Sequence, residues 1–178
     1  LTGLLLIIFT PLLFGLASTS FLDSIDFYFR KFEFNASLYY LFRYVGTIVS
    51  GYNLIHFIGP MLAIVTLITN IYLASRSKVY DESSFWNYSL IILTTYLLLA
   101  TTVHPWYTIS LVLFGVCTSR IYPIIWSFLA FVSYVNYSYD PYFENMWFIA
   151  FEYILLFIVM TIENKMTPFL PAKTIALP

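Results

Sequence analysis

The feature that most constrains this chain is a series of apolar runs separated by short polar connections. Six runs cover residues 1–17, 53–74, 85–102, 106–119, 121–137 and 146–162. Each helix that crosses a bilayer needs about 20 mainly apolar residues. With 178 residues, of which 61% are hydrophobic and 10% charged, the chain has room for little besides such helices. The sequence therefore predicts an all-α, polytopic integral membrane bundle of about six transmembrane helices.

Two segments are predicted to lie outside these spans. Residues 18–52 are expected to form an ordered extracytoplasmic loop, and residues 163–178, which contain three prolines, an irregular tail. The chain opens on Leu1 inside an apolar run and without a charged flank, so we interpret it as part of a longer protein.

Basic residues in the short connections predict how the spans are oriented. Short cytoplasmic loops carry an excess of lysine and arginine. This rule places inside five of the eight basic residues, namely Arg76, Lys78, Arg120, Lys165 and Lys173. The loop 18–52 and the turns at residues 103–107 and 138–145 then share the outer face. We expect a multi-pass protein of the cell membrane whose functional face is extracytoplasmic.

The segment from Arg30 to Arg43 holds three of the eight basic residues. Within it, Asn35 is expected to cap a short helix that Gly46 ends. The apolar face of this helix is expected to pack on the bundle and comprises Leu38, Leu41, Phe42 and Val45. The opposite face comprises Tyr39, Tyr40 and Arg43. The guanidinium of Arg43 would then face an anion, or it would pair with Glu33 or reach the lipid headgroups.

The turn at residues 103–107, VHPWY, is predicted to start a helix beside a histidine. Proline is favoured at the first helical position, and the free amides that follow it attract anions such as phosphate. His104 lies at that point and is able to donate to a phosphate oxygen, while Trp106 and Tyr107 offer flat faces to a sugar or a prenyl chain. The alternative is an interfacial turn with aromatic residues at the membrane boundary.

Other polar residues have structural interpretations that compete with functional ones. His56 is expected to be packed or hydrogen-bonded near the outer side of its span. A carboxylate within a span, such as Glu152, often marks a functional site, but we favour a structural interpretation, in which it either snorkels to the interface or pairs within the bundle. Asp23 and Asp26 fit the solvated face of an interfacial helix as well as they fit a role as bases.

The sequence excludes several other classes of site. The net charge of -1 argues against a nucleic-acid surface. No zinc motif, glycine-rich phosphate loop or nucleophile elbow is present. Cys117 is the single cysteine, so disulfides and thiolate metal sites are not available, and it is expected to be a small buried side chain. No metal site is visible, although participation of a divalent metal ion stays open.

Two motifs carry a resemblance to a known family. The segment FEFNASLYYLFRYVG at residues 32–46, followed after two spans by TVHPWY at residues 102–107, resembles the C-terminal half of bacterial polytopic GT-C glycosyltransferases, especially the mannosyltransferase-like members. The resemblance covers residues 21–119 by motif and the remainder by hydropathy.

The resemblance implies a membrane enzyme that transfers a sugar, mannose in particular, with inversion from a polyprenyl-phosphate donor to a lipid or glycan acceptor. The family's catalytic carboxylate lies in an earlier outer loop, which this sequence does not contain, so no catalytic residue is assigned. The resemblance implies that Arg43 and His104 bind the donor phosphate and that Trp106 and Tyr107 line the path of the sugar or prenyl chain. The residues expected to order the loop are Glu33, Asn35 and Tyr39.

Two other functions are compatible with the residues. A transporter or flippase for a lipid-linked glycan would bind the same headgroup, with polar groups near the middle of the membrane. A non-catalytic membrane scaffold would use the outer loop for docking. Clustering of charge outside the spans favours the enzyme over the transporter.

Overall fold

The computed structural model describes residues 23–24, 26–27, 30–76, 81–141 and 143–166, and the predicted span 1–17 lies outside them. Regular structure in this part of the chain is helical, apart from one isolated bridge between Phe34 and Thr102. The elements in chain order are α3 (Leu38–Ser50), α4 (Ile55–Arg76), α5 (Glu82–Leu99), the 3-10 helix η1 (Pro105–Thr108), α6 (Ile109–Thr118), α7 (Tyr122–Val132), the 3-10 helix η2 (Ser133–Ser138) and α8 (Met146–Met166).

Among the described helices, α4 and α8 are long and apolar enough to cross a membrane. They have 22 and 21 residues, and the mean hydropathy of each is 1.9. Helix α5 has 18 residues and is more polar, while α6 and α7 have 10 and 11 residues. These three occupy predicted spans, but η1 precedes α6 and η2 follows α7 as 3-10 extensions. The fold is therefore all-helical as predicted, with two span-length helices in the described residues.

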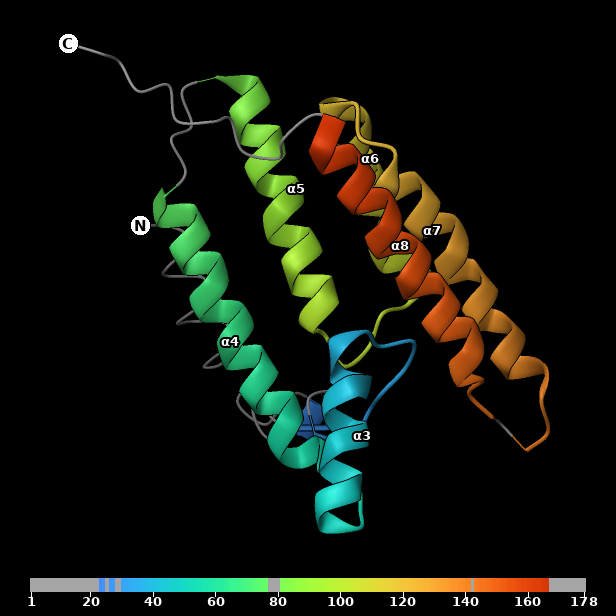
Figure 1. Cartoon of the computed structure of the whole chain (residues 1–178). Helices are drawn as coiled ribbons and strands as arrows, with labels where there is room; N and C mark the ends of the chain where they lie inside the picture. The colour runs from blue at the N-terminus through green and yellow to red at the C-terminus, as the bar shows by residue number, and fades with distance from the viewer. Residues whose placement is uncertain (1–22, 25, 28–29, 77–80, 142, 167–178) are drawn as a thin grey trace, which may run out of the picture.

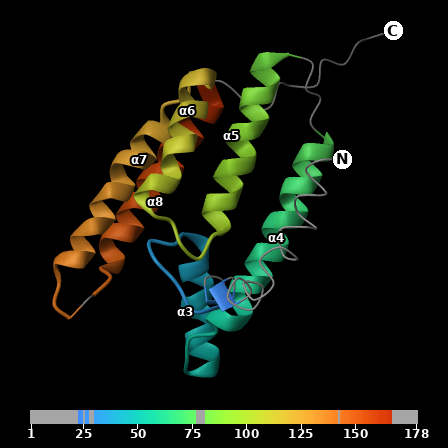
Figure 2. The same cartoon turned by 180° about the vertical axis from the view of Figure 1, so that it is seen from behind.

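The helices pack in chain order. Figure 1 shows α4 and α5 side by side, then α6, α7 and α8 as a tighter group, and contacts link each helix to the next. Figure 2 shows from behind that α3 lies at the end of the bundle where α4 begins and α5 ends. The loop before α3 thus reaches the same end of the bundle as the turn between α5 and η1.

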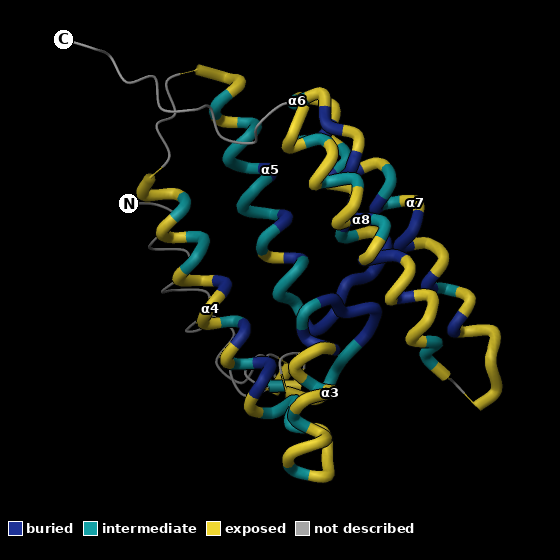
Figure 3. The backbone as a smooth tube through the Cα atoms, viewed as in Figure 1, coloured by how far each residue is buried: buried dark blue, intermediate teal, exposed yellow. Residues whose placement is uncertain are grey.

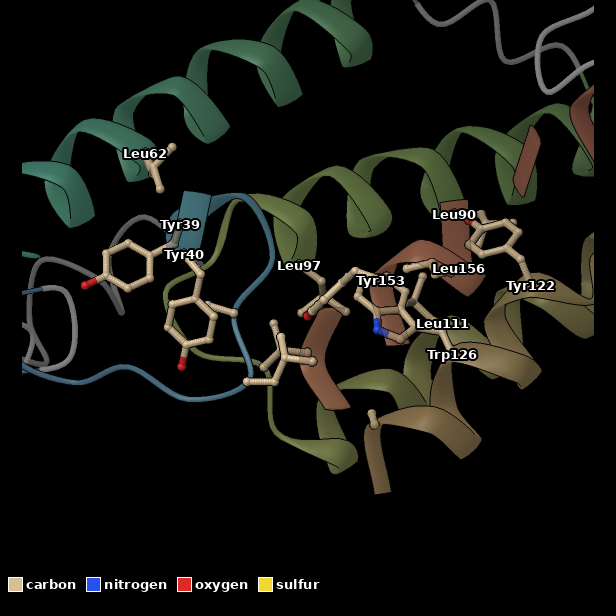
Figure 4. Close-up of a cluster of buried hydrophobic side chains, with 14 of the residues drawn as sticks. Tyr39, Tyr40, Leu62, Leu90, Leu97, Leu111, Tyr122, Trp126, Tyr153 and Leu156 are labelled. Atoms are coloured by element: carbon tan, nitrogen blue, oxygen red, sulfur yellow. The ribbon is translucent and has the colours of Figure 1, made fainter. Parts of the chain in front are cut away.

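A cluster of aromatic and aliphatic side chains forms the core. Trp126, Leu90, Leu111 and Leu156 have no exposed surface. Figure 4 shows Tyr39 and Tyr40 at one end of this cluster and Tyr122 at the other. Figure 3 shows exposed residues along the outer sides of α3, α4, α7 and α8. Many of these exposed side chains are large and apolar.

The orientation of α3 corrects the prediction for residues 35–46. The two tyrosines Tyr39 and Tyr40 are buried, whereas Leu41, Phe42 and Val45 are exposed. The helix is thus turned so that the face predicted to be free packs on the bundle. The reason is that acidic groups on the loop and before α8 accept hydrogen bonds from the tyrosine hydroxyls.

Both predicted ends of α3 are also wrong. Ser37, not Asn35, precedes the first turn, and the helix runs through Gly46 to a left-handed C-cap at Gly51, whose φ is 79°. A Cβ at Gly46 would lie 3.3 Å from Leu54 Cδ1. Gly46 therefore allows α3 and the start of α4 to approach closely, and a helix end is not needed there.

The last helix extends beyond the predicted span. Residues 163–166 of the predicted irregular tail are helical, and the rest of the tail lies outside the described residues. Glu163 accepts hydrogen bonds from the backbone amides of Ile121 at 2.7 Å and Tyr122 at 3.1 Å. A carboxylate at a helix N-terminus satisfies otherwise unpaired amides, so this contact holds the end of α8 against the start of α7.

Candidate functional site

The loop before α3 and the turn before η1 are joined by backbone hydrogen bonds. The amide of Phe34 donates to Thr101 O at 3.1 Å, and the amide of Val103 donates to Phe34 O at 2.8 Å. These bonds form the short parallel bridge between Phe34 and Thr102. The two segments that the sequence analysis placed on one face are thus in direct contact.

Glu33 joins the loop to α3 and to the start of α4. Its carboxylate accepts hydrogen bonds from the Tyr39 hydroxyl, from Arg43 Nη1 at 2.5 Å and from Asn53 Nδ2 at 3.2 Å. The Arg43 and Glu33 side chains are 25% and 24% exposed. Of the alternatives left open by the sequence, the ion pair with Glu33 is therefore the one found.

Arg43 also lies against residues at the start of α8. Its guanidinium lies over the Tyr40 ring at 4.4 Å and its Nη2 is 3.7 Å from Met146 Sδ. Tyr40 donates to Glu144, and burial raises the pKa values of both groups. Arg43 thus lies between two carboxylates and keeps several N–H donors, because a guanidinium has five.

Asn35 is the second centre of hydrogen bonding and has a left-handed backbone, with φ of 47°. Its amide N–H donates to Glu144 Oε1 at 2.6 Å, and its Nδ2 donates to Glu152 Oε1 at 3.2 Å. The Tyr153 hydroxyl donates to the carbonyl oxygen of Asn35 at 2.7 Å. Trp126 Nε1 also donates to Glu152, at 3.0 Å. Glu152 therefore pairs within the bundle, which is one of the two structural interpretations that the sequence left open.

An apolar groove of about 750 Å³ runs between α3 and α8 beside these clusters. Arg43 is the charged residue in its lining, and the other lining residues are mostly apolar or aromatic, including Leu41, Tyr44, Ile149, Ile154 and Phe157. Tyr40 and Tyr153 line it as well. A groove of this kind offers hydrocarbon contacts along its length and a positive charge at one place.

His104 lies outside the lining of this groove. Its ring is stacked on Trp106 at 4.2 Å and on Phe34 at 4.7 Å, with Tyr107 edge-on at 5.5 Å. The residue is 8% exposed, its Nδ1 has no hydrogen-bond partner, and burial lowers its pKa. His104 is thus a neutral ring in an aromatic stack at neutral pH. Trp106 is half-exposed and presents the outer surface of that stack.

The structure brings several of the predicted site residues into contact and shows further residues in the same clusters. Glu33, Tyr39 and Arg43 form one cluster, and the next loop residue, Phe34, holds His104. Sequence reasoning placed Tyr40 on the same face as Arg43 but gave it no role in the site, and it missed Asn53, Trp126 and Glu144. The one sequence signal at Glu144 was a carboxylate two residues before an apolar run, and its partners Asn35 and Tyr40 are about a hundred residues away in the chain.

The remaining candidates have smaller roles. His56 packs on Phe57 with ring centroids 4.3 Å apart, and Arg30 and Asp26 form an exposed ion pair at 2.8 Å. Cys117 is exposed, which corrects the prediction of a buried side chain, because it lies on the outer face of α6. In the described part of the chain, no three His, Cys, Asp or Glu residues are grouped to hold a metal ion.

The fold and these clusters define an all-helical protein in which α4 and α8 are long and apolar enough to cross a membrane. Comparison of the chain with protein-family models, with curated proteins and with solved structures finds no match.

Proposed function

We propose that this chain is the C-terminal part of a GT-C type membrane glycosyltransferase. It would move a sugar, mannose in the members it resembles, from a polyprenyl-phosphate donor to a lipid or glycan acceptor. The observation that carries this proposal is the groove between α3 and α8, because its apolar lining with Arg43 matches an isoprenoid chain that ends in a phosphate. The chain would lie in the cell membrane with about six spans and its active face extracytoplasmic.

The proposed reaction assigns an electrostatic role to Arg43. An acceptor hydroxyl attacks the anomeric carbon, the bond from that carbon to the phosphate oxygen breaks, and polyprenyl phosphate leaves with the bonding electrons. The hydroxyl proton passes to the carboxylate that the family, by the resemblance, carries in an earlier outer loop. Arg43 stabilises the charge that develops on the leaving phosphate, and Glu33 holds the guanidinium in place.

The loop-ordering roles of Glu33, Asn35 and Tyr39 are supported by their contacts with α3, α4 and α8. A donor-phosphate role for His104 stays a prediction, since the stacked ring has an unpaired Nδ1 but does not line the groove. Trp106 and Tyr107 next to it would contact the sugar or the prenyl chain from the exposed side of the stack.

The test is a sugar-transfer assay on the full-length protein with a panel of polyprenyl-phosphate sugars. Arg43→Ala should lower kcat/KM by about 10-fold to 100-fold, the effect of losing a charge-assisted hydrogen bond in the transition state. Arg30→Ala is the matched control, because Arg30 forms an exposed pair with Asp26. Unchanged turnover in both Arg43→Ala and His104→Ala, with normal membrane insertion, would contradict the site assignment.

A second candidate, movement of a lipid-linked glycan across the membrane without chemistry, is favoured by one observation. Glu152 and Asn35 form a buried polar pair inside the helix bundle, where transporters place their binding groups. Vesicles containing the full-length protein and a fluorescent lipid-linked sugar separate the two functions. Movement of the label between leaflets without product formation would favour the transporter.

A further inference from the structure

The outward side of α3 is an apolar surface that takes no part in the hydrogen bonds and ion pairs described above, although Leu41 and Tyr44 at its edge also line the groove. We define the α3 outer face as Leu41, Tyr44, Val45, Ile48 and Val49. Their exposed fractions run from 59% at Val45 to 81% at Val49. Arg43 is the charged residue of α3, and it turns toward Glu33 and Met146. The α3 outer face therefore carries no charge.

This arrangement is the reverse of an amphipathic helix on a water-soluble protein. In water the apolar stripe packs on the core and the polar stripe faces outward. Here the tyrosine hydroxyls and the guanidinium face the bundle, where they meet Glu33 and Glu144. A contiguous exposed apolar surface of this kind marks a contact with a membrane or with a partner.

Contacts of α3 place it beside the ends of the two span-length helices. Arg43 touches Met146, the first residue of α8, and Gly46 faces Leu54 and Ile58 at the start of α4. Figure 1 shows that α3 continues past this end of the bundle. The outward side chains of both long helices are apolar as well, with Phe57 65% and Ile154 61% exposed. The α3 outer face is thus continuous with surfaces of helices suited to cross a bilayer.

We propose that the α3 outer face is immersed in one leaflet of the bilayer, with Leu41 nearest the hydrocarbon and Val49 nearest the headgroups. The loop-to-helix segment is then part of the membrane surface, whereas the sequence analysis expected the apolar face of this helix to pack on the bundle. A consequence is that the groove between α3 and α8 opens sideways to lipid, so an amphiphile enters it without leaving the membrane. This inference depends on the membrane location of α4 and α8 and not on sugar transfer.

Spin labels on single cysteines test this surface. The full-length protein is placed in vesicles of phosphatidylcholine and phosphatidylglycerol, in a cysteine-free background that includes Cys117→Ala. Labels at Leu41→Cys, Val45→Cys and Ile48→Cys are compared with Ile154→Cys on α8 and with Glu82→Cys, an exposed position before the apolar part of α5. Collision with oxygen, which concentrates in lipid, is measured against collision with a water-soluble nickel chelate.

Labels on the α3 outer face should favour oxygen several-fold over the ratio found at Glu82, as at Ile154, and the preference should fall from Leu41 to Ile48. A nickel-dominated signal on α3 would mean that this face is in water and would overturn the proposal. An immobile label shielded from both reagents would mean that protein covers the face, which also overturns it. Loss of sugar transfer in other variants affects neither result.

Discussion

The side-chain amide of Asn35 donates a hydrogen bond to the carboxylate of Glu152 at 3.2 Å, although 117 residues separate them in the chain. Asn35 has no exposed surface and Glu152 is 3% exposed. Together with the bonds from Tyr153 and to Glu144, this contact attaches the loop before α3 to α8. The position of Arg43 beside the groove therefore depends on a residue in the first third of α8, the last described helix.

Replacing Asn35 should loosen this attachment. Asn35→Ala leaves Glu152 with Trp126 as its remaining described donor, and we expect a loss of about 1–3 kcal/mol in the free energy of unfolding. Thermal unfolding in detergent measures it. Asn87→Ala is the control, because that side chain bonds within its own helix, and it should change little. Equal stability of the two variants would contradict the anchoring role of Asn35.

The carboxylate of Glu33 should contribute more to the free energy of unfolding than that of Asp26, although each forms an ion pair with an arginine. Glu33 accepts from three side chains and is 24% exposed, whereas Asp26 pairs with Arg30 at 39% exposure. We expect Glu33→Ala to cost about 1–3 kcal/mol and Asp26→Ala less than about 1 kcal/mol. Hydrogen exchange of the α3 amides, which should become faster in Glu33→Ala alone, is the measurement.

The close approach of α6 and α7 depends on Gly115. A Cβ there would lie 2.9 Å from Pro123 Cγ and 3.1 Å from the carbonyl oxygen of Arg120, and neither group moves easily. Gly115→Ala should therefore cost about 1–3 kcal/mol through overpacking. At Gly46 the nearest atom is the flexible end of Leu54, at 3.3 Å, so Gly46→Ala should cost less. The unfolding temperature of Gly115→Ala should therefore be the lower of the two. A lower unfolding temperature for Gly46→Ala would contradict this prediction.

The buried ring of His104 should make stability depend on pH. Burial lowers its pKa, so below its ordinary value of about 6.5 the unfolded chain binds a proton that the folded chain does not. Stability should then rise with pH between the folded pKa and about 6.5. His104→Phe keeps a ring for stacking but does not titrate, so it should remove this rise.

Titration of Glu144 changes stability with pH in the opposite direction, so its contribution has to be separated from that of His104. Its pKa is raised by burial, so its contribution is largest at low pH and is lost as pH rises through the folded pKa. The quantity to measure is the difference in unfolding free energy between wild type and His104→Phe at several pH values, in which the Glu144 contribution cancels. A difference that does not change with pH would show that His104 does not titrate differently in the folded state.

Hydrophobic pattern was sufficient to predict that the chain is helical and where most helices lie. The predicted runs at residues 53–74 and 146–162 correspond to α4 and α8, whose boundaries differ from the prediction by a few residues. Helix ends were harder, because Gly46 looked like a terminator and serves instead as the point where α4 packs on α3. The spacing of apolar residues shows which side chains share a helix face, but it does not show whether that face packs on the bundle or points outward.

Local sequence also predicted that residues 30–43 and 103–107 lie on the same face of the helix bundle, since both segments connect apolar runs at that face. Backbone bonds between Phe34 and the turn bear out that contact. What local sequence did not contain was the partner of each charge. Tyr40 with Glu144, and Asn35 with Glu152, are pairs that form because α8 packs beside the loop.

The sequence alone thus determined an apolar, helical chain with few charges gathered near helix ends, because apolar content and its period are local properties. Tertiary structure decided which side of α3 faces the bundle and which acidic group holds each polar side chain. The physical reason is that a buried hydrogen bond or ion pair requires a partner at close range, and that partner is chosen by how distant helices pack.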